Sequence, residues 1–197
     1  MAPRLLVTGF GPFPGAPANP TADLVAGLRV GTHGGIEVRA ETLAVEYALL
    51  DHWHDVLDLL RPDAILHFGL AGGARGIRVE TRAMNNALPY RADDAGRLPR
   101  RLIDPAGPAM RRASLPAEAI RDAVAATGAR VRLSIDAGDY LCNAILYSSL
   151  AWCARHRGAR AGFVHVPASD AATLRPGFEA AVGAVAATLS RAAASSG

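Results

Sequence analysis

The sequence predicts an α/β fold in which helices cover both faces of a mainly parallel sheet, within a single domain over residues 1–197. Short apolar segments alternate with longer segments of helical periodicity along the whole chain. A length of 197 residues suits one domain with a sizeable core, and 50% of the residues are hydrophobic. No internal repeat and no linker interrupts the alternation.

The first part of the chain predicts three strands and two helices. Arg4–Thr8 indicates a buried strand, because contiguous apolar residues precede a loop rich in Gly and Pro. Asn19 followed by Pro20 predicts a helix start, with Asn as the N-cap and Pro at the first helical position, and the helix should reach about Leu28. The next expected elements are a strand over Glu37–Leu43, an amphipathic helix over Val45–Leu60 and a strand over Ala64–Phe68.

The middle of the chain is less regular. Apolar and polar residues alternate over 77–83, which predicts a half-exposed strand. The periodicity then disappears from Asn85 to Ala113, in a segment rich in Pro, Arg, Asp and Gly. Long irregular segments in compact domains are often functional, so this segment is a candidate part of a site.

The last part of the chain returns to regular alternation. Pro116 opens a helix that Gly128 ends, and a turn over 136–138 precedes a helix that begins at about Tyr140. The remaining expected elements are a strand over Val131–Ile135, the rest of that helix to His156, a strand over Ala161–Val166 and an alanine-rich helix that follows Arg175 and Pro176.

The charge pattern excludes several functions. The 21 basic residues are all arginine, and with 18 acidic residues they give a formal net charge of +3. The absence of lysine rules out a Schiff-base lysine, a phosphate-loop lysine and a lysine general base. Apart from short clusters at Arg100–Arg101 and Arg111–Arg112, the arginines are scattered, so we expect no nucleic-acid partner.

The two cysteines predict a reduced protein. Cys142 and Cys153 are eleven positions apart, about 16 Å if both lie on one helix, whereas a disulfide requires Cα atoms within about 7 Å. A cytoplasmic location is the simplest interpretation. The first apolar run is too short for a signal peptide, and no stretch approaches the length of a membrane span, so we expect no membrane partner.

Three polar residues together suggest thiol chemistry. Cys142 lies near the start of an expected helix, where the positive end of the helix dipole favours a thiolate. His165 lies at the carboxyl end of an apolar strand, and Glu80 lies in the alternating strand. A thiolate, an imidazole that activates it and an acid that orients the imidazole are what thiol-dependent acyl transfer requires.

Each of these residues also has a structural interpretation. A cysteine in an apolar helix is more often a core residue, as Cys153 beside Trp152 illustrates. A glutamate in an alternating strand usually faces water. His67 lies in an apolar segment much like that of His165, so the residue pattern alone leaves the choice between the two histidines open.

Four ordered motifs carry a resemblance to a known family. They are Thr8–Phe13 with Asn19–Thr21, Gly69–Arg75 with Val79–Asn85, Ala137–Asn143, and Gly162–Pro167. In these motifs and their spacing the sequence resembles pyroglutamyl peptidase I (pyrrolidone-carboxylate peptidase), a family of cysteine peptidases that remove an N-terminal pyroglutamyl residue from peptides.

The resemblance implies a catalytic triad of Cys142, His165 and Glu80, and it favours His165 over His67. It also implies a twisted central sheet of the phosphorylase/hydrolase-like kind, no metal, no cofactor and a homo-oligomer, either a dimer or a tetramer. Aromatic side chains suit a flat, neutral lactam ring. The expected substrate-binding residues are Phe10, Phe13, Asn19, Leu70, Arg91 and Tyr140.

Two positions depart from the family pattern. Leu70 stands where the family has Gln, which removes an amide from the recognition shell. The family's Arg-Ile-Pro-Asp-Asn run corresponds here to residues 90–94, with Tyr90 at the arginine position and Arg91 one place on. An unpaired buried lactam group would cost about 1–3 kcal/mol, so specificity could shift while bond cleavage is retained.

Because of these departures, two other functions remain as alternatives. One is a divergent thiol amidase of the same family with altered acyl specificity, and another is a non-catalytic binding protein with a vestigial site. A phosphate or nucleotide binder using Gly9–Gly11 is disfavoured, because Pro12 and Pro14 lack the N–H donors that a phosphate needs.

Overall fold

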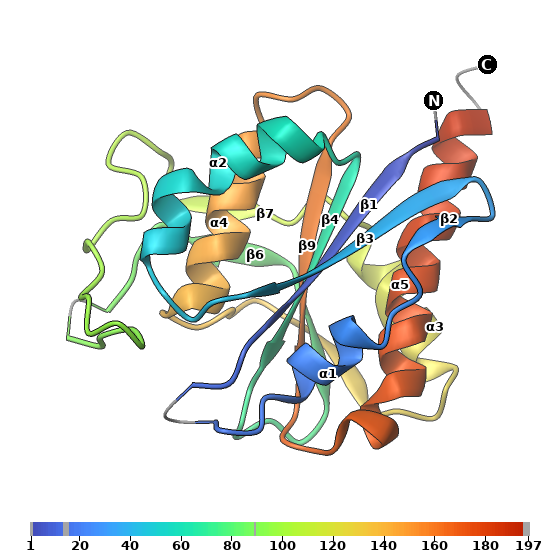
Figure 1. Cartoon of the computed structure of the whole chain (residues 1–197), viewed down its shortest axis with the longest axis horizontal. Helices are drawn as coiled ribbons and strands as arrows, with labels where there is room; N and C mark the ends of the chain where they lie inside the picture. Colours follow the sequence, from blue (N-terminus) through green and yellow to red (C-terminus); the bar gives the residue numbers. More distant parts are fainter. Residues whose placement is uncertain (1, 14–15, 89, 195–197) are drawn as a thin grey trace.

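The computed structural model describes residues 2–13, 16–88 and 90–194. Within these residues a seven-stranded sheet runs through the molecule, with strand order β2-β3-β1-β4-β9-β5-β8. Helices cover both of its faces, so the predicted α/β architecture is confirmed (Figure 1). The strands are β1 (Arg4–Phe10), β2 (Gly31–His33), β3 (Ile36–Leu43), β4 (Ala64–Leu70), β5 (Ile77–Glu80), β8 (Val131–Ser134) and β9 (Arg160–Val166).

The directions of the strands bring distant parts of the chain to one edge. Strands β3, β1, β4 and β9 are mutually parallel, and β5 runs antiparallel to β9 but parallel to β8. The carboxyl ends of β1, β4 and β9 therefore lie beside the amino ends of β5 and β8. Functional groups of α/β proteins gather at the carboxyl ends of such parallel strands.

Two hydrophobic cores lie on opposite faces of the sheet. Helices α2 (Ala48–Leu60) and α4 (Leu141–Cys153) cover one face, and α1 (Pro20–Ala26), α3 (Ala117–Ala125) and α5 (Ala171–Ala194) cover the other (Figure 1). Strands buried on both faces read as continuous apolar runs, which is why β1 and β4 were easily recognised in the sequence. None of the helices in the described residues is long and apolar enough to cross a bilayer.

The expected single strand over 77–83 is wrong. It divides at Thr81 into β5 and a separate strand β6 (Arg82–Met84), which pairs with β7 (Met110–Arg112) in a small second sheet. The backbone N–H and the hydroxyl of Thr81 both donate to the carbonyl of Ser134, the last residue of β8. The expected half-exposure is also wrong at Glu80, which is fully buried because it shares with Phe163 the face of the sheet that α4 covers.

Several element boundaries differ from the expected ones for local reasons. Helix α5 begins at Ala171 instead of near Pro176, because the side chain of Asp170 caps its first turn through the backbone N–H of Thr173. Helix α2 begins at Ala48 rather than Val45. The three-residue strand β2 carries too little pattern to be seen in the sequence.

The irregular segment that follows β6 is held in place by buried polar side chains. The amide of Asn85 exchanges hydrogen bonds with the backbone of Asp104, at 2.7 and 2.9 Å. The carboxylate of Asp93 accepts from the backbone N–H groups of Tyr47 and Arg97, at 2.6 and 2.7 Å. This segment therefore packs as a fixed wall beside α2 and α4, although it has almost no regular secondary structure.

Candidate active site

The expected nucleophile, Cys142, is the second residue of α4 and is half-buried. The turn before the helix contains Gly138 with a φ of 81°, a left-handed conformation that suits glycine. The first-turn N–H groups of a helix have no helical carbonyl partner and point toward its amino end. The sulfur therefore lies beside free backbone donors and the positive end of the helix dipole.

The sulfur of Cys142 lies against two neighbouring rows of residues that run across the sheet. One row consists of Gly69 on β4, His165 on β9 and Arg78 on β5, and the next consists of His67, Phe163 and Glu80. The absence of a side chain at Gly69 leaves space beside His165. A Cβ atom built at Gly69 would lie 2.9 Å from the Cys142 sulfur, so the sulfur occupies that space.

The other two expected triad residues are bonded to each other. Nδ1 of His165 lies 2.8 Å from Oε1 of Glu80, and both side chains are buried. A carboxylate only accepts hydrogen bonds, so Nδ1 carries the proton and Nε2 is left for Cys142. Arg78 adds a guanidinium whose Nε lies 3.7 Å from the same carboxylate oxygen.

The environment of His165 favours its charged form. Burial of the ring opposes protonation, but hydrogen bonds with Cys142 and Glu80 and the charges of these two partners outweigh it and raise the pKa of His165 to about 9. At neutral pH the ring is therefore a cation between two acidic partners. This is the electrostatic arrangement of an activated thiol.

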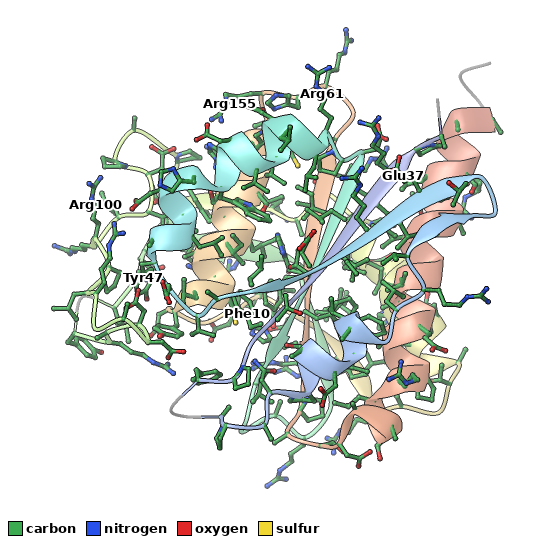
Figure 2. The ribbon with its side chains drawn as sticks, viewed as in Figure 1. Phe10, Glu37, Tyr47, Arg61, Arg100 and Arg155 are labelled. Atoms are coloured by element: carbon green, nitrogen blue, oxygen red, sulfur yellow. The ribbon has the colours of Figure 1, made fainter. Side chains whose placement is uncertain are left out.

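A small pocket of about 190 Å³ opens beside the sulfur. All six expected substrate-binding residues line it together with Cys142 and His165, whereas Glu80 lies behind the histidine ring. Arg91 lines this pocket, and Tyr90 is 77% exposed and does not. The six residues are Phe10, Phe13, Asn19, Leu70, Arg91 and Tyr140. Figure 2 shows Phe10 near the middle of the fold and Tyr47 on the left, at the start of α2.

Asn19 supports the pocket through its bonds to the backbone. Its Oδ1 accepts from the N–H of Thr21 at 3.1 Å, which confirms the expected helix cap, and its Nδ2 donates to the carbonyl of Gly11 at 3.0 Å. The same side chain thus fixes the start of α1 and the loop that carries Phe13.

Arg91 and Tyr140 join the irregular segment to the turn before Cys142. The guanidinium carbon of Arg91 lies 4.2 Å from the centre of the Tyr140 ring, and the Tyr140 hydroxyl donates to the carbonyl of Ala92. Tyr47 packs edge-on against Tyr140 with ring centres 5.6 Å apart. Arg91 therefore places a cation in the pocket wall.

His67 and Cys153 lie outside this arrangement. Nδ1 of His67 is 2.6 Å from the Thr8 hydroxyl and Nε2 is 2.9 Å from the Ser149 hydroxyl, and burial lowers the pKa of the ring to about 3. Burial raises the pKa of the Cys153 thiol to about 12. A neutral histidine and a protonated thiol in the core fit the structural interpretation of both residues.

Sequence reasoning missed two residues that shape the site. Gly69 makes room for the sulfur, and Arg78 faces Glu80. The sequence around each residue does not indicate its role, because that role depends on which strand lies beside it in the sheet. Among the described residues, no group of three or more His, Cys, Asp or Glu side chains is arranged to hold a metal ion.

Comparisons with known proteins assign the chain to a family. A family model described as pyroglutamyl peptidase matches residues 3–182. The pyrrolidone-carboxylate peptidase of Chromobacterium violaceum is 39% identical over 168 residues, covering 83% of this chain and 77% of that protein. Pyrrolidone-carboxylate peptidase 1 of Caldanaerobacter subterraneus is 30% identical, covering 83% of this chain and 82% of that one.

Solved structures give the same result for the fold. The pyrrolidone carboxyl peptidase of Thermococcus litoralis superposes with a TM-score of 0.88 at 25% identity, covering 96% of each chain. Pyroglutamyl peptidase I of Bacillus amyloliquefaciens superposes with a TM-score of 0.86 at 26% identity, covering 94% of this chain and 97% of that one.

Proposed function

Because this chain belongs to the pyroglutamyl peptidase family of cysteine exopeptidases, we propose that it removes N-terminal pyroglutamyl residues from peptides through a Cys142–His165–Glu80 triad. The observation that carries the proposal is that a buried, charged His165 lies between Cys142 and Glu80 at the edge of a small pocket. The domain proposed to carry this activity is residues 1–197.

In the proposed first step, the thiolate of Cys142 attacks the carbonyl carbon of the pyroglutamyl residue. Negative charge develops on the carbonyl oxygen, and backbone N–H groups of the first turn of α4 stabilise it. The tetrahedral intermediate collapses as Nε2 of His165 gives its proton to the departing amine. The C–N bond breaks, the shortened peptide leaves, and a thioester joins the pyroglutamyl group to Cys142.

In the second step a water molecule replaces the peptide. Neutral His165 takes a proton from this water, whose oxygen attacks the thioester carbonyl. The carbon–sulfur bond then breaks, free pyroglutamate leaves, and the thiolate and the imidazolium are restored. Glu80 orients the ring in both steps, since its 2.8 Å bond fixes the proton on Nδ1.

Binding of the lactam ring is proposed to rest on Phe10 and Phe13, whose faces suit a flat, neutral group. Leu70 offers the ring no hydrogen bond, so backbone groups of the pocket must pair with the lactam N–H and C=O. Leu70, which stands in the pocket wall where the family has Gln, favours the second candidate function, a thiol amidase of this family acting on a different acyl group.

A fluorogenic pyroglutamyl amide tests the first candidate, with the variants Cys142→Ala and Cys153→Ala as a matched pair. We expect Cys142→Ala to abolish turnover and Cys153→Ala to retain it. Equal loss in both variants would contradict the assignment of the nucleophile. Rapid alkylation of Cys142 without turnover of any pyroglutamyl substrate would favour the second candidate.

Two finer expectations stay predictions. Two unpaired cysteines are consistent with a cytoplasmic location, and the family resemblance favours a homo-oligomer. Light scattering of the purified protein would distinguish a monomer from a dimer or tetramer.

A further inference from the structure

A second hollow opens directly beside the pocket at Cys142. It has a volume of about 880 Å³ and shares Ala71 and Arg78 with the smaller pocket. Its walls are the segment 71–78, which connects β4 to β5, and residues 130–132 at the start of β8. The two hollows are therefore neighbours, and Arg78 contributes to the lining of both.

All charged side chains that line this second hollow are positive. Four arginines line it and no acidic residue does, so we call it the arginine groove; its arginines are Arg75, Arg78, Arg130 and Arg132. In the part of the chain that the structure describes, Arg75, Arg130 and Arg132 are exposed and form no ion pair with a carboxylate. Their positive charges are thus available to a ligand.

Arg78 differs from the other three because it is partly buried. Its Nε is shielded from solvent and, among the described residues, has no hydrogen-bond partner, although Oε1 of Glu80 lies 3.7 Å away. A guanidinium presents five N–H donors in a planar fork that matches carboxylate oxygens. Among the described residues, the Nε donor of Arg78 is therefore without a hydrogen-bond partner in the free protein.

The order of residues along the sheet edge says which part of a substrate would enter the groove. From β1 across β4 and β9 to β5, the edge carries Phe10, Leu70, His165 and Arg78, and Arg132 follows on β8. In the proposed reaction the lactam ring lies against Phe10, and the departing amine lies against His165. The residues after the scissile bond must then continue past His165 toward Arg78.

We propose that the arginine groove binds the part of the substrate after the pyroglutamyl residue and selects peptides that carry a carboxylate close to the scissile bond. This inference rests on the proposed function, because that function fixes the direction of the peptide. The carboxylate could belong to an aspartate or glutamate side chain or to the C-terminus of a short peptide. Both present the same chemistry to a guanidinium.

A peptide series distinguishes these sources. The neutral reference is pyroglutamyl-Ala-Ala-amide, and its matched partners are pyroglutamyl-Glu-Ala-amide, the free acid pyroglutamyl-Ala-Ala and pyroglutamyl-Lys-Ala-amide. We expect kcat/KM for the carboxylate-bearing peptides to be roughly tenfold above the reference, the effect of about two exposed ion pairs. Faster cleavage of only the glutamyl peptide or only the free acid identifies the source. The preference should weaken as salt is raised.

The double variant Arg130→Gln/Arg132→Gln tests the groove itself. We expect the ratio of kcat/KM between acidic and neutral peptides to fall close to one. The matched control is Arg61→Gln/Arg157→Gln, which removes two exposed arginines from another part of the molecule (Arg61 is at the top of Figure 2) and should keep the ratio. A ratio near one in the unaltered protein, or the same drop in the control, would overturn the inference.

A binding measurement separates this inference from the proposed function. The same peptides are titrated into the Cys142→Ala protein, which cannot cleave them, and into that protein with the groove variant added. If the unaltered enzyme cleaves no pyroglutamyl peptide, the proposed function fails. The groove is still supported in that case if the Cys142→Ala protein binds acidic peptides more tightly than neutral ones and the groove variant loses this difference. Equal binding of acidic and neutral peptides, or displacement of the acidic peptides by a short single-stranded oligonucleotide at lower concentration, would refute it.

Discussion

Replacement of Gly69 by alanine tests how closely β4 positions the expected nucleophile. The added Cβ would lie 2.6 Å from Cζ of Phe163 and 2.9 Å from the sulfur of Cys142, whereas ordinary contacts begin at 3.4 Å. The ring would have to move by about 0.8 Å and the sulfur by about 0.5 Å. Both neighbours lie in packed surroundings, so neither can move without disturbing others.

The expected effect falls on activity more than on folding. A misplacement of about 1 Å can cost about 100-fold in rate, so we expect kcat/KM on the pyroglutamyl reporter to fall by about 10- to 100-fold. Overpacking of this kind costs about 1–3 kcal/mol, which lowers the melting temperature by about 2–12 °C in a chain of this size. Steady-state kinetics and thermal melting measure the two effects separately.

Gly183→Ala provides the control. A Cβ at Gly183 on α5 meets nothing within 4 Å, so this change should leave kcat/KM unaltered and should not lower the melting temperature. If Gly69→Ala lowers the melting temperature but retains full kcat/KM, then the sulfur seated against Gly69 is not the group that attacks the substrate. If it changes neither quantity, the close contact itself is refuted.

The two other predictions concern the histidines. Because the pKa of folded His165 is raised to about 9, above its unfolded value, this group stabilises the fold fully below about pH 6.5 and loses that contribution as the pH rises through 9. Glu80→Gln removes a partner that raises this pKa, so the free energy of unfolding, measured in urea from pH 6 to 9, should fall less steeply in the variant; equal slopes would contradict the role of Glu80. His67→Leu leaves the Thr8 hydroxyl without its His67 partner, at a cost of about 1–3 kcal/mol, and leaves the Ser149 hydroxyl with only the hydrogen bond from Nε1 of Trp53. It should therefore lower the melting temperature while kcat per folded molecule is retained. Loss of kcat in His67→Leu with little change in stability would instead make His67 the functional histidine.

The alternation of apolar strands and amphipathic helices was sufficient to predict the three-layer fold. Its strongest elements, such as β1, β4 and α2, owe their structure to burial patterns that the sequence displays directly. Glu80 shows where that reasoning stops. Alternating polar and apolar residues fit a strand with one wet face and a strand with a buried ion pair equally well, and only the packing of α4 on that face of the sheet decides between them.

The two histidines illustrate the same limit within the site. His67 and His165 lie in similar apolar segments, but their partners come from elsewhere in the chain: Ser149 for one and Glu80 for the other. The family resemblance favoured His165, and local sequence could not. Gly69 was missed for the same reason, since the atom that its missing side chain accommodates belongs to a residue 73 positions away in the sequence.

Helix α4 places the two thiols of the chain in very different surroundings, which makes the protein a natural two-signal reporter. A thiol-directed label added to the native protein should modify Cys142 and leave Cys153, whose thiol is buried and protonated. The amount incorporated would then count competent sites, and a pocket ligand would slow the labelling. A second equivalent would enter only when the core opens. Occupancy of the site and unfolding of the domain could thus be followed in one sample, with no residue altered.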